Sequence, residues 1–237
     1  MRLISWNCHF GGFEKEKIEA VLPLKPDVLV VPECEQVENS STRHWIGDET
    51  GFGLAIYTFG DYRLSPLDAP DPNIRLVLPF KISNDKTDFT LFAVWTKDNK
   101  NVSYVMQTWN ALQKYEKHLA DERVVLAGDF NSTPKVKPDS ESRDAEGKAV
   151  DHNRIVEFLA AKGIHSVYHW HVDELHGEET QPTYYHQWKQ EQPFHLDYCF
   201  ASDALAKCVK NVEVGAYDDW VQSKRSDHVP LIVDFDL

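Results

Sequence analysis

The chain has 237 residues, of which 42% are hydrophobic and 12% aromatic, so it is large enough and apolar enough to bury a sizeable core. A net charge of -13 argues against a protein that coats long duplex DNA through a broad basic surface. No apolar run approaches the ~20 residues of a membrane span, and the N-terminal segment lacks the apolar stretch of a signal peptide. We therefore expect a cytoplasmic protein with no membrane segment.

Strand-like runs recur along the whole chain, at 2–6, 27–32, 53–58, 74–82, 88–95, 123–128, 195–201 and 229–235. Two of them contain unbroken apolar stretches, at 28–31 and 124–127, which is typical of central strands buried on both faces. The run 88–95 alternates between two faces that are both largely apolar, so it is also expected in the interior.

Three amphipathic segments predict helices, at 14–22, 102–120 and 151–162. The first is expected to end before Pro23, and Gly163 is expected to end the third in a left-handed conformation. Mixed strands with few intervening helices indicate an α/β or α+β sandwich, with two sheets packed face to face and helices outside.

Two segments lack the periodicity of a core element, 133–150 and 171–194. The second is rich in rings and directly precedes a strand that carries polar residues, so Tyr184, Tyr185 and Trp188 are predicted to bind substrate. For the first segment, a groove-forming loop and an ordinary solvated loop both remain open.

Four short segments place carboxylates, amides or an imidazole beside predicted strands, at 5–7, 32–34, 128–131 and 226–228. Polar groups at the ends of several strands converge on one patch of a packed sheet. A patch of this composition has the donors of a hard-metal site with a general base beside it. The pattern therefore predicts metal-assisted hydrolysis, with a phosphate ester as the preferred substrate.

Asp129 and Asn131 are two residues apart, so on an extended strand both side chains would face the same way while Phe130 points into the core. A carboxylate and an amide on one face can orient a water molecule and hold a phosphate oxygen.

The ordered motifs resemble those of the endonuclease/exonuclease/phosphatase superfamily, and the resemblance extends from residue 2 to residue 235. The motifs are Trp6-Asn7, Glu33, Gly128-Asp129-Phe130-Asn131, Leu196-Asp197-Tyr198 and Ser226-Asp227-His228. The resemblance implies a four-layer α/β-β/α sandwich made of one domain over residues 1–237.

The same resemblance implies a role for each motif residue. Glu33 would be the principal ligand of Mg²⁺ or Mn²⁺, and Asp227 would face the metal or its water. Asn7 would contact the metal-bound phosphate. Asp129 would position or deprotonate the attacking water, and Asn131 would hold the phosphate. His228 would bind a non-bridging oxygen or act as general base, with Asp197 bonded to its other ring nitrogen.

Two positions depart from the family pattern. Trp95 stands at or near a position where many members have histidine or tyrosine, so Trp95 would stack on a base, or Lys97 would supply the positive contact, or the alignment is shifted. His9 stands where some members have an acidic residue; a structural role is preferred over contact with a metal such as Mn²⁺. The histidines at 165, 169, 171 and 176 match no H-E-x-x-H pattern, so a zinc site among them is not favoured.

We therefore predict a monomeric, metal-dependent hydrolase of phosphate esters, preferably a nuclease-like phosphodiesterase, with nucleic acid as one of its candidate substrates. The alternative within the superfamily is a phosphatase acting on a small phosphorylated alcohol or a lipid headgroup. A non-catalytic binding protein of the same fold is disfavoured, because buried unpaired carboxylates cost stability when no cation compensates them.

Overall fold

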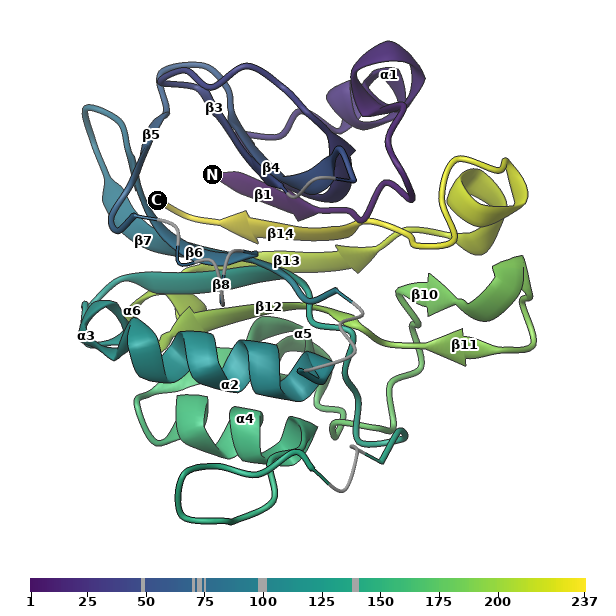
Figure 1. Ribbon diagram of the computed structural model, residues 1–237. Coiled ribbons are helices and arrows are strands. Elements are labelled where there is room, and N and C mark those ends of the chain that lie inside the picture. The colour runs from purple at the N-terminus through teal and green to yellow at the C-terminus, as the bar shows by residue number, and fades with distance from the viewer. Residues whose placement is uncertain (48–49, 70, 72–73, 75, 98–101, 138–140) are drawn as a thin grey trace.

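Two six-stranded sheets pack face to face, and helices cover their outer faces (Figure 1). This computed structural model describes residues 1–237 except 48–49, 70, 72–73, 75, 98–101 and 138–140. The architecture confirms the expected α/β-β/α sandwich of two mixed sheets. No helix in the described part of the chain is long and apolar enough to cross a membrane.

The first sheet has the strand order β13-β14-β1-β2-β4-β3. Its strands are β1 (Arg2–Ser5), β2 (Val28–Glu35), β3 (Arg43–Gly47), β4 (Phe52–Thr58), β13 (Val209–Val214) and β14 (Leu231–Phe235). β1 and β2 are parallel, and every other neighbouring pair is antiparallel.

The second sheet has the order β5-β6-β7-β8-β12-β9. Its strands are β5 (Arg63–Pro66), β6 (Val77–Ser83), β7 (Asp88–Trp95), β8 (Val124–Asp129), β9 (Ile164–Ser166) and β12 (Asp197–Ser202). Only β7 and β8 are parallel. A small separate ribbon pairs β10 (Tyr184–Tyr185) with β11 (Pro193–Phe194).

The strand pairing brings the polar motifs to one end of the sandwich. β14 runs antiparallel to β1 with Leu231 opposite Ser5, so the segment before β14 lies beside the segment after β1. In the other sheet, Asp197 at the start of β12 lies directly opposite Asp129 at the end of β8. The β10–β11 ribbon projects from this same end (Figure 1).

The principal core lies between the sheets and continues along one face of β7. Phe89, Leu91, Ala93 and Trp95 belong to this inter-sheet core. The alternate residues of the strand, such as Phe92, pack instead beneath the outer helices. The alternation of two apolar faces in 88–95 therefore matches a strand buried on both sides.

The helices are short and lie outside the sheets (Figure 1). They are α1 (Ile18–Val21), α2 (Tyr104–Lys114), α3 (Glu116–Leu119), α4 (His152–Ala160), α5 (Val167–Val172) and α6 (Asp203–Ala206). Single turns of other helical type are η1 (Phe13–Lys17), η2 (Leu22–Leu24), η3 (His186–Trp188) and η4 (Asp218–Gln222). The Asp151 side chain caps α4 by accepting a hydrogen bond from the Arg154 amide at 2.9 Å.

The element boundaries differ from those predicted in several places. The helix expected to end before Pro23 continues as a 3₁₀ turn through Pro23, which is tolerated because a proline early in a turn needs no amide donor. The helix expected over 102–120 is interrupted at Tyr115. The third helix ends at Ala160, two residues earlier than predicted, and the predicted left-handed conformation of Gly163 is confirmed by its φ of +69°. The predicted strand 74–82 and loop 133–150 include residues 75 and 138–140, which lie outside the described residues.

Candidate active site at the end of the sandwich

The Asn7 side chain joins the two sheets at the centre of the site. Its Nδ2 donates to Glu33 Oε1 at 3.0 Å and to Asp129 Oδ2 at 2.9 Å. Asn7 follows β1 of the first sheet, whereas Asp129 ends β8 of the second. A buried amide that binds two carboxylates fixes their separation, so groups more than a hundred residues apart meet here as the sequence predicts.

Glu33 is aimed into the site by a β-bulge. The pairing of β2 with β4 shifts register between Val31 and Cys34, and Glu33 has a φ of +60°, in the left-handed region. A bulge turns one side chain out of the regular alternation of a strand. Glu33 Oε2 also accepts a hydrogen bond from the Phe10 amide at 3.0 Å, so both oxygens are held from the loop after β1.

Asp129 and Asn131 face the same site, although not because the strand continues through them. β8 ends at Asp129, and Asn131 is left-handed with a φ of +47°. Asp129 Oδ1 accepts from the Asn131 amide at 2.9 Å and Oδ2 accepts from Asn131 Nδ2 at 2.8 Å. Phe130 is buried in the core beneath the outer helices, as predicted. Asn131 Nδ2 also donates to the Thr96 carbonyl.

A close approach of backbones fixes the position of Asp129. Gly128 has a φ of +146°, and a Cβ placed there would lie 1.8 Å from the Val94 carbonyl oxygen of the neighbouring strand. Any other residue would force β8 away from β7 just before Asp129. The glycine of the Gly-Asp-Phe-Asn motif is therefore required by packing.

His228 and Asp197 form a buried pair. His228 Nδ1 lies 2.8 Å from Asp197 Oδ2. Burial alone would lower the pKa of His228, but the Asp197 carboxylate, with Asp129 and Asp227, outweighs burial and raises this pKa to about 10. Burial also raises the pKa of Asp129, and the nearby Asp197 carboxylate adds to that effect. The imidazole is thus a cation among carboxylates at neutral pH.

Ser226 holds the His228 backbone in place. Its hydroxyl donates to the Asn7 carbonyl at 2.7 Å and accepts from the His228 amide at 3.0 Å. The buried indole of Trp6 donates to the His228 carbonyl at 3.1 Å. The segments after β1 and before β14 are therefore bonded to one another where both enter the site.

Asp227 pairs with His9 at the edge of the site. Their Oδ1 and Nδ1 atoms lie 3.0 Å apart. Burial tends to raise the pKa of Asp227, but the bond from His9 and the His228 charge together lower it. Asp227 is therefore an ionised carboxylate, and His9 supports it from the side.

In the segment 171–194, here called the substrate loop, Tyr184 is the residue that reaches His228. Its ring centroid lies 4.7 Å from that of His228, and the two residues form an isolated backbone bridge. Burial raises the pKa of Tyr184 to about 12, with further contributions from Asp227, Asp129 and Glu33. The phenol therefore lies in the combined field of these three carboxylates.

Of the other two aromatic residues predicted to contact substrate, Trp188 lies at the edge of the active site, here called the rim, and Tyr185 lies in the core. Trp188 packs edge-on against His9 at 5.0 Å, which places it on the rim. Tyr185 points the opposite way: it is buried against the outer face of the first sheet and contacts Tyr217. The predicted substrate contact of Tyr185 is therefore not supported, because adjacent residues of an extended segment face opposite sides.

Trp95 lies in the inter-sheet core with 3% of its surface exposed. An indole buried to this degree has no free face for a substrate ring, so the predicted stacking of Trp95 is not supported. Lys97 is two residues further on, half-buried, with its Nζ 3.1 Å from Thr50 Oγ1 and 5.6 Å from the Trp95 ring centroid. Its substrate contact remains a prediction.

Two aromatic residues that the motif analysis did not single out belong to this region. Phe10 follows His9, is 61% exposed, and packs against Phe52 at 5.6 Å between ring centroids. Tyr104 begins α2, and its charge contributes to the raised pKa of Tyr184, so the two phenols are neighbours. A phenylalanine three residues after the motif residue Asn7 was the available sequence signal for Phe10.

The donor set suits a hard divalent cation. Four carboxylates gather here, those of Glu33, Asp129, Asp197 and Asp227. Asp197 Oδ1 is buried and has no hydrogen-bond partner among the described residues, and carboxylate oxygens of Asp129 and Asp197 lie within 4.8 Å of each other. An excess of oxygen donors, one of them unsatisfied, is the environment that Mg²⁺ or Mn²⁺ would complete.

We compared the chain with models of known protein families and with curated proteins. The chain matches the Endonuclease/Exonuclease/phosphatase family over residues 4–228. A search of curated proteins finds no match.

Solved structures with the same fold cover nearly all of the chain. A 3'-5' exonuclease (NExo) from Neisseria meningitidis aligns with a TM-score of 0.65 at 19% identity, over 100% of both chains. An AP endonuclease from Archaeoglobus fulgidus aligns with a TM-score of 0.66 at 17% identity, over 100% of both chains. The endonuclease domain of TRAS1, a telomere-specific non-LTR retrotransposon, gives 0.65 at 16% identity, over 99% of this chain and 97% of that one.

Proposed function

Because the chain belongs to the Endonuclease/Exonuclease/phosphatase family, we propose that it is a metal-dependent phosphodiesterase that cleaves nucleic-acid strands. The observation that carries the proposal is the Asn7 amide bonded at once to Glu33 and Asp129, beside the buried Asp197–His228 pair. Hydrolysis of a phosphate ester needs a cation site, a group that orients water and a positive charge near the phosphoryl oxygens, and these residues offer all three.

Glu33 and Asp227 are the residues we assign to a divalent cation, which when bound would neutralise charge on the phosphoryl oxygens. Asp129 Oδ1 and Oδ2 accept three bonds, from Asn7 and from Asn131. A carboxylate held this rigidly can orient an attacking water for in-line displacement. Its raised pKa favours a role as the acceptor of the water proton.

His228 is proposed to stabilise charge rather than to remove a proton. Its pKa of about 10 keeps the ring protonated at neutral pH, so it can donate from Nε2 to a non-bridging oxygen. Asp197 holds the ring through Nδ1 and compensates its charge. Asn131 supplies an amide on the same side. The products would be a free hydroxyl and a phosphate monoester.

The rim favours strands with exposed bases. Phe10, Tyr184 and Trp188 offer ring faces around the carboxylates, and aromatic platforms bind unpaired bases without sequence preference. The structural neighbours include a 3'-5' exonuclease, an AP endonuclease and a 3' phosphatase bound to a product DNA hairpin. The 3' phosphatase makes hydrolysis of a phosphate monoester the second candidate function.

Two chromogenic esters separate the candidates. We expect Mg²⁺- or Mn²⁺-dependent hydrolysis of bis-p-nitrophenyl phosphate in preference to p-nitrophenyl phosphate, and loss of that activity with EDTA. Asp129→Asn should reduce turnover about 10³-fold while the protein stays folded. The matched control is Asp85→Asn, which alters an exposed aspartate in the turn between β6 and β7.

A phosphatase would instead hydrolyse the monoester preferentially, and a binding protein would hydrolyse neither compound. Full activity of Asp129→Asn would refute the assignment of the water-orienting group. We further propose that residues 1–237 act as one domain and as a monomer, which size-exclusion chromatography with light scattering would test. The cytoplasmic location remains a prediction.

A further inference from the structure

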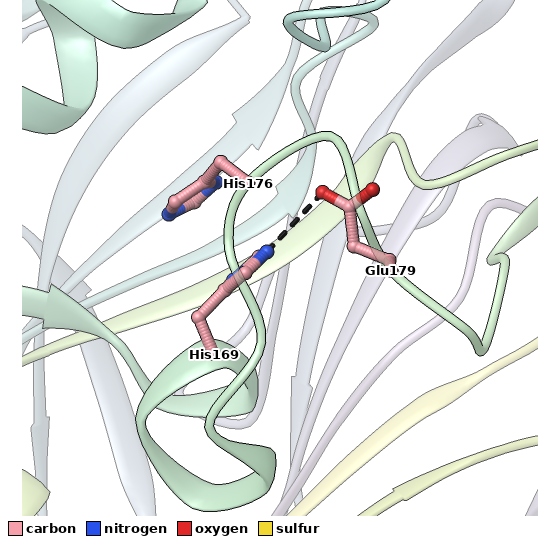
Figure 2. Close-up of side chains that lie close together, drawn as sticks. All are labelled: His169, His176 and Glu179. Carbon is pink, nitrogen blue, oxygen red and sulfur yellow. Dashed lines mark hydrogen bonds and ion pairs between the residues drawn. The ribbon is translucent and has the colours of Figure 1, made fainter.

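A second group of potential metal ligands lies apart from the active-site carboxylates. His169 comes from α5, and His176 and Glu179 come from the loop that follows it; the three converge (Figure 2). One donor atom from each lies within 4.8 Å of the others. His169 Nε2 is 3.2 Å from Glu179 Oε1, and the rings of His169 and His176 stack at 3.6 Å.

Two buried polar atoms, one in this cluster and one next to it, have no hydrogen-bond partner among the residues that the structure describes. They are Glu179 Oε2 and His195 Nε2. The Glu179 side chain is 1% exposed, and the Lys135 ammonium is 3.9 Å away from Oε2. A buried carboxylate oxygen without a donor costs folding free energy, and so does an unsatisfied imidazole nitrogen. A ligand that accepts electron pairs from both would remove the cost.

Neighbouring side chains orient the imidazoles as they do around metal ions. Ser166 Oγ lies 2.7 Å from His169 Nδ1, which directs Nε2 of that ring toward Glu179. His152 Nε2 lies 3.1 Å from His176 Nδ1. Hydrogen bonds to the far nitrogen of a ligating histidine fix its tautomer and its direction.

We propose that His169, His176 and Glu179, with His195 as the fourth donor, form a structural site for a borderline divalent transition metal such as Zn²⁺. Two or three imidazoles with one carboxylate match the nitrogen-rich, four-coordinate sites that Zn²⁺ and Co²⁺ occupy, and they do not match the oxygen shell of Mg²⁺. To coordinate the metal, the His176 ring must rotate out of its stack on His169, so that one ring nitrogen of each histidine points to the same position.

The His176 and His195 imidazoles can serve as ligands at neutral pH because burial keeps them uncharged. Burial lowers the pKa of His176 to about 3 and the pKa of His195 to about 4. Glu179 remains ionised: burial tends to raise its pKa, but the bonds from His169 and the Gly177 amide lower it to about 2. These directions agree with the donor geometry.

A metal bound at this site would restrict the movement of the substrate loop. His176 and Glu179 precede Tyr184 on one loop, and His195 lies two residues before Asp197. The metal would therefore connect α5 to the loop that presents Tyr184 and to the start of β12. This inference does not depend on the proposed phosphodiesterase activity.

Co²⁺ titration of the full-length, metal-stripped protein in excess Mg²⁺ tests the proposal. Mg²⁺ occupies oxygen-rich sites and competes poorly at nitrogen donors. We expect one equivalent of Co²⁺ to produce the intense visible absorption of a four-coordinate nitrogen-containing site. His176→Gln and Glu179→Gln should each weaken this binding at least about tenfold. His171→Gln, which alters an exposed histidine on the same helix, should bind as wild type does.

A second measurement uses Zn²⁺ alone. Zn²⁺ should raise the melting temperature of the wild type and of His171→Gln, and it should raise the melting temperature of His176→Gln much less. The proposal is overturned if folded wild-type protein gives no such absorption. It is equally overturned if the absorption persists at the same affinity in both His176→Gln and Glu179→Gln.

Discussion

The active-site end of the sandwich and the histidine cluster behind it differ in donor chemistry and in how the chain builds them. The active site gathers oxygen donors from strand ends of both sheets, with Asn7 as the joint. The histidine cluster (His152, His169, His176 and His195, with Glu179) gathers mainly nitrogen donors from α4, α5 and the loop between α5 and β12. If both proposed assignments hold, one fold would bind a hard cation at the end of the sandwich and a borderline metal at the histidine cluster.

The two regions differ also in backbone strain. Nine non-glycine residues in the described part of the chain have positive φ, and six of them line or adjoin the active site: His9, Phe10, Glu33, Asn131, Gln187 and Trp188. None of the proposed ligands in the histidine cluster is among the nine. Left-handed residues cost free energy and persist where the surroundings over-determine them, which is common at functional sites.

The largest expected effect separates the two regions by removing the main oxygen donor. Glu33→Gln should lower kcat/KM for bis-p-nitrophenyl phosphate about 10³-fold, because an amide holds a divalent cation far less well than a carboxylate. The Co²⁺ absorption assigned to the histidine cluster should be unchanged. Glu38→Gln, at an exposed position after β2, is the control and should retain full activity. If Glu33→Gln abolished the Co²⁺ absorption, the two regions would not be independent.

Acid should weaken the metal-free protein through the histidine cluster. Burial lowers the pKa of His152 to about 3 and that of His195 to about 4, whereas the unfolded chain binds those protons near pH 6.5. The unfolded state therefore gains protons first, and stability falls as the pH drops below about 6.5. Burial lowers the pKa of His176 to about 3 as well, so between about pH 6.5 and about pH 5.5 these three imidazoles should together lower the free energy of unfolding by about 3 kcal/mol.

His228 has the opposite sign. The pKa of His228 is raised to about 10 in the folded protein. Its contribution to the free energy of unfolding is therefore complete below about pH 6.5 and is lost as the pH rises from about 6.5 to about 10. Urea unfolding in EDTA across both ranges measures the two trends. Equal stability at about pH 6.5 and about pH 5.5 would contradict the assignment of neutral, buried imidazoles.

A smaller effect should come from the hydrogen bond that links the two regions. Ser132 follows Asn131 of the active site, and its Oγ lies 3.0 Å from His152 Nδ1. Ser132→Ala should destabilise the protein by about 1 kcal/mol, because one buried hydrogen bond is lost. Turnover should stay close to that of the wild type. A tenfold loss of kcat in a folded Ser132→Ala protein would show that the cluster supports catalysis directly.

The smallest effect is expected at the exposed rim. Phe10→Ala should raise KM for a single-stranded oligonucleotide about fivefold and leave kcat unchanged, since one stacking contact is worth roughly 1 kcal/mol. Leu175→Ala removes a side chain of similar exposure, away from the active-site carboxylates, and should change neither constant. Equal KM values for wild type and Phe10→Ala would exclude Phe10 from the substrate surface.

The parts of the site that follow from strand ends were predictable from sequence. Apolar runs fix where β8 and β14 lie, and the polar residues beside them, Asp129 and His228, must then meet at one end. The burial of Trp95 was also predictable, because it shares a face of β7 with Phe89 and Leu91. The resemblance to family members predicted a substrate contact for Trp95, whereas the alternation of apolar residues along the strand predicted a core position.

The histidine cluster was beyond sequence reasoning. His152, His169, His176 and His195 are separated by irregular intervals and meet only through packing of α4, α5 and the loop before β12. The bulge that directs Glu33 into the site could not be predicted either, because Val28–Glu35 has the composition of an ordinary buried strand. Both features depend on which elements pack together, which local patterns do not encode.

The left-handed backbone of Glu33 has a consequence for laboratory evolution. A glycine at this position would adopt the same φ of +60° without steric cost, but it would remove the hydrogen bonds that the carboxylate accepts from Asn7 and Phe10. Because the two effects oppose one another, selection of random variants for heat resistance alone should not strictly retain glutamate at position 33. Survivors that carry glycine would keep the fold and lose the carboxylate on which the proposed chemistry rests.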